Sequence, residues 1–214
     1  LTVNVKCGAT ISNIKGIDAG EFPLVPQGGD VDITLPGKTL KEMINQTVFA
    51  AAKEDNRPIL TGVLTQLDGN VMTMASADGY RLAVRTTEIE QTFSQRVDLV
   101  IPAKALTEVG RIISDEDDVV TITLPKDRDI VLFHMKHTDV ATQLLEGKFP
   151  DFAAIIPRSY VTSSVMYTSD LLSACKRAEI FARDSAYSAK LRVKPASGPG
   201  EPGAVTIIGM SAER

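Results

Sequence analysis

A repeat at a spacing of 66 residues constrains this chain more than any other feature of the sequence. Residues 31–44 and 97–110 align without a gap, and both copies carry Val, Asp, Pro, Lys, Leu and Glu at equivalent positions. In each copy a β-branched run stops at a proline, Pro36 or Pro102, which cannot continue a strand ladder. An amphipathic pattern follows each proline. The repeat therefore predicts strand, stop and helix, used twice.

The patterns that follow each proline define the fold class. Apolar residues recur with helical spacing over 37–53 and over 103–114, so one side of each predicted helix faces a core. Strand patterns come after each helix, and Asp68-Gly69 predicts a type I′ turn between strands 59–67 and 71–75. The chain is thus expected to be an α+β protein, with a pseudo-two-fold domain whose two helices lie side by side against antiparallel sheets.

The same patterns predict three parts. Residues 1–30 read as two short strands and a linker at the end of one domain, and residues 31–157 as a complete domain. Residues 158–214 begin a third copy, because Phe181-Ala182 follows Phe49-Ala50 by 132 positions. The first residues alternate like a strand already under way, with no initiating methionine, so we expect a fragment of a longer protein.

Composition excludes several classes of protein. The chain is 43% hydrophobic and 23% charged, as in soluble globular proteins, and its formal net charge is −4. An acidic total argues against coating nucleic acid with the whole surface, but it allows one locally basic face. No apolar run reaches the ~20 residues of a membrane span. Cys7 and Cys175 lie far apart in the sequence and suit a reducing cytoplasm.

The residues that would carry catalysis or metal binding do not form a recognisable set. His134 and His137 are three apart in a strand pattern, which sends their side chains to opposite faces. The acidic run 115–118 lacks the ligand spacing and central glycine of a calcium loop. No glycine-rich phosphate loop precedes a helix. We therefore expect no enzyme activity, no metal and no cofactor.

The polar faces of the two predicted helices both contain basic residues. Both copies place a lysine two residues after the proline, and the basic residues of these faces are Lys38, Lys41, Lys104 and Arg111. A solvated helix face is the alternative to a functional one. Repetition favours a common basic surface, because the acidic residues concentrate in loops.

Three segments resemble the middle domain of the bacterial sliding clamp family, the beta subunits of DNA polymerase III. They are Arg57-Pro-Ile-Leu-Thr-Gly-Val-Leu, Ala77-Asp-Gly-Tyr-Arg-Leu-Ala and Gly147-Lys-Phe-Pro-Asp-Phe, in the family's order and spacing. The likeness covers the whole chain. Two departures stand out: Ala77 replaces a common threonine, and Pro58-Ile59 replaces aromatic residues that contact DNA in some members.

The resemblance implies a processivity factor, a head-to-tail homodimeric ring of clamp-fold domains around duplex DNA. Its helices would line the hole, so the four basic residues would meet phosphates. It also implies a hydrophobic groove for short peptides of the polymerase III catalytic subunit, the clamp loader and other clients. By motif, the groove residues are Arg57, Leu60, Ala77, Gly79, Tyr80, Arg81, Leu82 and Pro157. The alternative is a protein-interaction domain that never meets DNA, and Leu60 and Leu82 have a second interpretation as core residues.

Overall fold

The chain divides into two compact units, Leu1–Ile155 and Ile156–Arg214, which are described separately. The computed structural model describes residues 1–21, 31–54, 56–114, 119–125, 129–183, 187–196, 198 and 201–210. The linker predicted at 27–30 and the acidic run 115–118 lie outside these ranges.

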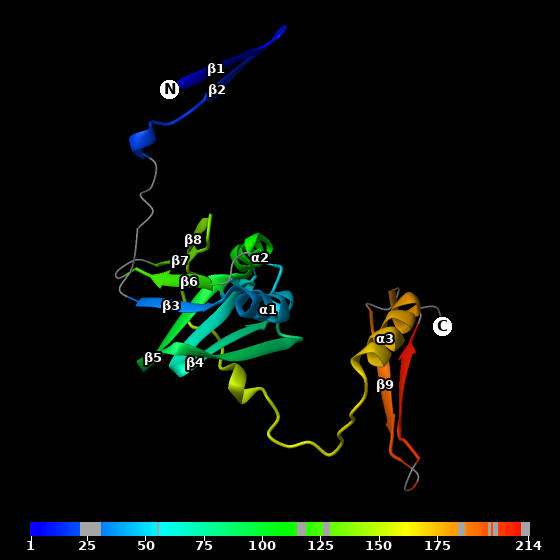
Figure 1. The fold of residues 1–214 in the computed structure, drawn as a ribbon. Coiled ribbons are helices and arrows are strands. Elements are labelled where there is room, and N and C mark those ends of the chain that lie inside the picture. The colour runs from blue at the N-terminus through cyan, green and yellow to red at the C-terminus, as the bar shows by residue number, and fades with distance from the viewer. Residues whose placement is uncertain are drawn as a thin grey trace. The chain divides into compact units, whose positions relative to one another are not determined.

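In its described residues, the first unit contains two α-helices and antiparallel strands (Figure 1). The helices are α1 (Gly37–Thr47) and α2 (Ala103–Ile112). The strands are β1 (Thr2–Cys7), β2 (Thr10–Lys15), β3 (Val31–Pro36), β4 (Gly62–Ala77), β5 (Leu82–Pro102), β6 (Val119–Leu124), β7 (Ile130–His134) and β8 (Asp139–Gln143). β1 pairs with β2, β4 with β5, and the remaining four form a sheet in the order β3-β6-β7-β8.

The two repeats exchange strands. β3 is the first strand of the first repeat, and it pairs with β6 of the second repeat, from Val31 opposite Leu124 to Pro36 opposite Val119. The equivalent strand of the second repeat is the end of β5, and it pairs with the start of β4, which belongs to the first repeat. Neither repeat can complete its sheet without the other, so the doublet in the sequence forms one unit.

The helices α1 and α2 lie side by side, as the repeat predicts (Figure 1). The Lys41 ammonium, near the start of α1, donates a hydrogen bond of 2.8 Å to the Ile113 carbonyl just after α2, so the helices run antiparallel. Ile44 and Gly110 occupy equivalent positions of the two repeats, and they meet where the helices touch. A Cβ added at Gly110 would lie 3.1 Å from Cγ2 of Ile44.

One large core joins these helices to the β4-β5 sheet and the β3-β6-β7-β8 sheet. It includes Leu40 and Ile44 from α1, Leu106 and Val109 from α2, and Phe133 from β7, each at most 1% exposed. The apolar stripes predicted on the two helices are confirmed. A smaller cluster, which we call the Leu60 cluster, consists of Leu60, Leu64, Ala75, Val100 and Phe149.

The hairpin predicted at Asp68-Gly69 is wrong. β4 continues through these residues, and the chain turns instead at residues 78–81 before β5 begins. Gly69 has the positive φ that suggested a turn, 56°, but it lies at register shifts between β4 and β5. A positive-φ glycine serves a bulge as well as a tight turn, and long strands on both sides hold this one within the ladder.

The second unit contains α3 (Thr168–Ala182) and the antiparallel pair β9 (Ala189–Lys194) and β10 (Ala204–Gly209). The helix and hairpin predicted there are confirmed. The helix packs closely on β10, because Gly209 has no side chain to meet the backbone of Ala178. Ala178 and Ala182 are buried, and small side chains on the helix permit this approach.

Gly110→Val should destabilise the first unit by about 1–3 kcal/mol, since the added methyl groups enter a filled core against Ile44. Native-state hydrogen exchange of the β4 amides measures the free energy of opening. The matched control is Thr107→Val on the exposed side of the same helix, which should change that energy by less than about 0.5 kcal/mol. Equal effects of the two variants would show that the helix contact is unimportant.

Thr65→Val should stabilise the first unit by about 1 kcal/mol. Thr65 is 2% exposed, and its hydroxyl oxygen Oγ1 has no hydrogen-bond partner, so folding leaves a desolvated polar group that valine would remove at nearly constant volume. The same exchange measurement applies. Thr65→Ser keeps the hydroxyl and loses the methyl group, and it should destabilise by about 1 kcal/mol. A destabilised valine variant would contradict this reading of the hydroxyl.

Candidate functional site

A pocket of about 700 Å³ lies in the first unit where two irregular segments meet. One segment follows α1 and contains a short 3₁₀ helix, Pro58–Thr61. The other is the turn at residues 78–81 between β4 and β5. The lining residues are Ala52, Lys53, Glu54, Asn56, Arg57, Leu60, Asp78, Gly79, Tyr80 and Arg81.

The turn is organised by one carboxylate. Oδ1 of Asp78 accepts hydrogen bonds from the backbone amides of Tyr80, at 3.0 Å, and Arg81, at 3.1 Å. Oδ2 of Asp78 accepts a third from Nε of Arg81, at 2.9 Å. Gly79 takes the positive φ, 93°, that this tight turn requires. The Tyr80 amide, with smaller contributions from Arg81, holds the pKa of the Asp78 carboxyl below its usual range.

Aromatic and basic groups surround the turn. The Arg81 guanidinium carbon lies 5.8 Å from the ring centroid of Phe49, a cation–π geometry. Phe49 lies on the short 3₁₀ helix Val48–Ala50 that follows α1, and it is 56% exposed. The Tyr80 side chain is fully exposed. Leu60 is only 5% exposed, because it closes the pocket from below and joins the Leu60 cluster.

The structure brings together most of the residues predicted for the groove. Arg57, Leu60, Gly79, Tyr80 and Arg81 line the pocket. Ala77 and Leu82 face each other as the last pair of β4 and β5, next to the turn but outside the lining.

Pro157 is exposed and belongs to the second unit. The core interpretation of Leu60 also holds, since the residue serves both the pocket and the Leu60 cluster. The roles of Pro157 and Leu60 in a peptide-binding groove stay predictions.

Sequence reasoning missed the residues that give the pocket its charge and order. The motif includes Asp78 but does not identify it as a hydrogen-bond acceptor. The available signal is its position two and three residues before the amides that donate to it, which is typical of a turn capped by an aspartate side chain. Lys53 and Glu54 lie in the lining without any pattern that marks them. Phe49 is remote in sequence from Arg81, so no local signal predicts their contact.

The four basic residues of α1 and α2 differ in their surroundings. Lys38 and Lys104 are exposed, and within the described residues neither ammonium has an acidic partner. Arg111 forms an ion pair with Glu108 at 2.7 Å. Lys41 is half-buried and bonded to Ile113, so part of its role is structural. Repetition in the sequence predicted a common face but not these partners.

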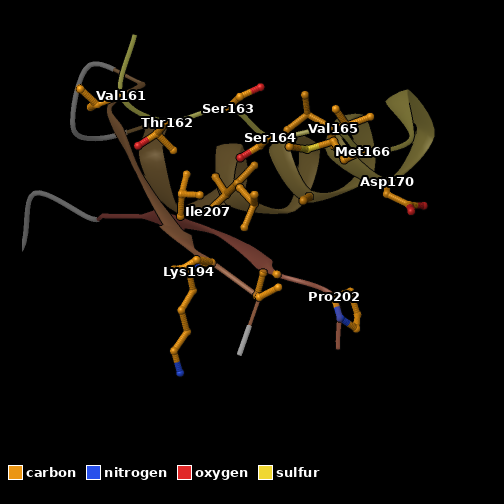
Figure 2. Close-up of a pocket in the computed structure, with 18 of the residues that line it drawn as sticks. Val161, Thr162, Ser163, Ser164, Val165, Met166, Asp170, Lys194, Pro202 and Ile207 are labelled. Carbon is orange, nitrogen blue, oxygen red and sulfur yellow. The ribbon is translucent and has the colours of Figure 1, made fainter. Parts of the chain in front are cut away.

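A second hollow, of about 1050 Å³, lies in the second unit (Figure 2). The segment with Val165 and Met166 runs beside α3, and Ile207 of β10 faces the helix. None of the predicted site residues lines it. In the part of this unit that the structure describes, nothing covers the exposed side chains of Leu172, Ile180 and Phe181 on α3.

Over the described ranges, no group of three or more His, Cys, Asp and Glu side chains is placed to hold a metal ion. His134 pairs with Asp139 across β7 and β8, with 2.8 Å between Nδ1 and Oδ1. In the same part of the chain, no helix combines the length and apolar character needed to cross a membrane.

Two curated proteins resemble this chain in sequence. The Beta sliding clamp of Bacillus subtilis is 34% identical over 194 residues, which is 90% of this chain and 51% of that protein. The Beta sliding clamp of Staphylococcus epidermidis is 34% identical over 181 residues, 84% of this chain and 47% of that protein. This chain thus spans about half the length of these relatives.

A solved structure and a family model complete the comparison. The crystal structure of the DNA polymerase sliding clamp from Bacillus subtilis matches with a TM-score of 0.78 and 32% identity, over 97% of this chain and 57% of that one. The model of the DNA polymerase III beta subunit, central domain, matches residues 34–151. The chain therefore belongs to the DNA polymerase III beta subunit family, and it has that family's α+β clamp fold.

Proposed function

We propose that this chain acts in a DNA sliding clamp, a non-enzymatic processivity factor that encircles duplex DNA and tethers a replicative DNA polymerase. The observation that carries the proposal is the antiparallel pair α1 and α2, which presents matched lysines from the two repeats of a beta-subunit central domain. The proposal includes a homodimeric ring, loading by a clamp loader, and the three-part division 1–30, 31–157 and 158–214. It also includes a cytoplasmic location, which suits the free, exposed Cys7 and Cys175.

The spacing of the lysines supports contact with DNA. Lys38 precedes Ile44 by six residues, and Lys104 precedes Gly110 by six, in helices that run in opposite directions. At a rise of 1.5 Å per residue the two positions are about 18 Å apart along the helix pair. Two such charges reach phosphates that are not neighbours, and phosphate contacts carry no sequence information. We therefore propose non-specific contacts with phosphates, made chiefly by Lys38 and Lys104. Lys41 and Arg111 contribute less, because each already contacts a protein group.

The pocket supports a role in binding client peptides. Its floor is apolar at Leu60, its rim offers the exposed Tyr80 ring, and Arg57 and Arg81 add positive charge. A short peptide with apolar anchors beside an acceptor group fits this chemistry. We propose that the pocket is one part of the groove predicted from Arg57, Leu60, Ala77, Gly79, Tyr80, Arg81 and Leu82, and that the polymerase III catalytic subunit, the clamp loader and other clients bind there.

Lys38→Glu/Lys104→Glu should weaken binding of this chain to a fluorescent duplex and lower its salt dependence. Each phosphate contact contributes about 0.9 to the slope of log K against log salt concentration, so the double variant should lose about 2. Fluorescence anisotropy at several salt concentrations measures the slope. The unchanged chain should bind only weakly, with a Kd in the ~10⁻⁴ M range or looser at physiological salt.

The matched control for the DNA measurement is Lys53→Glu/Lys148→Glu, which makes the same change in net charge at exposed positions outside α1 and α2. It should leave the slope within about 0.5 of the unchanged chain. Equal losses in the two double variants would show that net charge alone governs binding. That result would favour the alternative, a protein-interaction domain that does not meet DNA.

Tyr80→Ala should weaken binding of a dye-labelled peptide with two large apolar side chains by about tenfold, because an exposed aromatic anchor loses its contact area. The fold should be unaffected, since the side chain is fully exposed in the free protein. Fluorescence anisotropy measures the affinity. The control, Tyr167→Ala, removes an 80% exposed tyrosine from the second unit and should leave the affinity unchanged. Identical affinity of the two variants would place the peptide elsewhere.

A further inference from the structure

We propose that Asp78 is a positioning residue for ligand recognition: its carboxylate sets the Arg81 guanidinium beside the Phe49 ring, so that the terminal nitrogens of Arg81 can take an acceptor oxygen of a bound peptide. This inference rests on the proposed peptide-binding role of the pocket. It assigns a function to an acidic residue of a pocket that also contains three basic side chains, Lys53, Arg57 and Arg81.

The hydrogen bonds of Asp78 divide between backbone and side chain. Oδ1 accepts the two amides that shape the turn, and Oδ2 accepts only Nε of Arg81. The carboxylate thus holds the backbone and the guanidinium of Arg81 together at the pocket rim. The Arg81 side chain is 48% exposed in this arrangement, so it is oriented without being buried.

Phe49 is the second contact that positions the Arg81 guanidinium. Its ring lies 5.8 Å from the Arg81 guanidinium carbon, while Asp78 occupies the Nε edge. Within the described residues, no protein acceptor is bonded to the terminal nitrogens of Arg81. Glu54, the other carboxylate of the lining, accepts instead from the amide of Asn56, at 3.2 Å. In the described part of the chain, the two terminal nitrogens are therefore the donors of the fork that a ligand can use.

A fixed guanidinium recognises oxygen acceptors better than a mobile one. The planar fork of arginine binds a carboxylate or carbonyl oxygen in a defined direction. An arginine that is already held loses less conformational entropy when a ligand arrives, so the same contact gives higher affinity. Asp78 also leaves the terminal nitrogens of Arg81 available to a ligand, because it uses only the Nε donor.

The test is a double-mutant cycle on peptide affinity, with Asp78→Asn, Arg81→Met and the double variant. Asparagine keeps an oxygen for the two backbone amides but loses the charged acceptor for Nε. We expect Asp78→Asn to weaken binding of the dye-labelled apolar peptide about fivefold in the unchanged chain and to have no effect in the Arg81→Met background. Non-additivity of this kind is the signature of two residues that act through one contact.

Two controls separate positioning from a merely structural role. Asp68→Asn makes the same charge change at an exposed site outside the pocket and should leave the affinity unchanged. The NMR signal of the Arg81 Nε proton should be protected from solvent exchange in the unchanged chain and lose that protection in Asp78→Asn, with the same melting temperature.

An equal loss of affinity from Asp78→Asn in both backgrounds, or an unprotected Nε proton in the unchanged chain, would overturn the inference. If the unchanged chain binds the peptide and Asp78→Asn binds it equally well, this inference alone fails. If Arg81 is held as described but the unchanged chain binds no peptide, the proposed function of the pocket fails, and with it the role of Asp78 in recognition.

Discussion

The contact between Ile44 and Gly110 is the constraint on which the first unit depends. Equivalent residues of the two repeats meet there, and the absence of a side chain on Gly110 lets α1 and α2 approach closely. Because the helices are antiparallel about this point, a lysine two residues after each proline is carried to opposite ends of the pair. The exchange of strands between repeats then holds both helices against shared sheets. A repeated sequence thereby becomes one surface with two matched charges.

The end of α1 connects this basic surface to the pocket. The Ser76 hydroxyl donates to the Thr47 carbonyl at the end of α1, at 2.5 Å, and both residues are fully buried. Phe49 follows within the next turn of the chain and lies against Arg81, while Ser76 leads into Ala77 and the Asp78 turn. The floor of the pocket comes from the Leu60 cluster, which includes residues of β4 and β5. The pocket is thus held by the secondary structure beneath it, although its lining is mostly irregular chain.

Sequence reasoning predicted correctly those features that follow from the local spacing of apolar residues and from the repeat. The stripe of Leu40 and Ile44, the proline stops and the side-by-side helices needed only local spacing and the repeat. It failed at Asp68-Gly69, because the same glycine conformation serves a turn or a bulge and the pairing of distant strands decides between them. The partner of Lys41 and the contact of Arg81 with Phe49 depend on which segments pack together. Such contacts leave no periodic trace in the sequence.

The four basic residues of α1 and α2 differ in their protein partners, and this difference affects how a protein of this kind could stay on DNA. Arg111 is paired with Glu108 and Lys41 with the Ile113 carbonyl, so among the described residues Lys38 and Lys104 are the basic side chains of this face without a protein partner. Under the proposed function, two phosphate contacts on a chain of net charge −4 would give weak attachment with a modest salt slope of about 2. Weak contacts allow sliding, because no position on the duplex holds the protein for long. Under the proposed function, retention would then have to come from enclosure, and the sparse charge of this helix face would suit a ring better than an open DNA-binding domain.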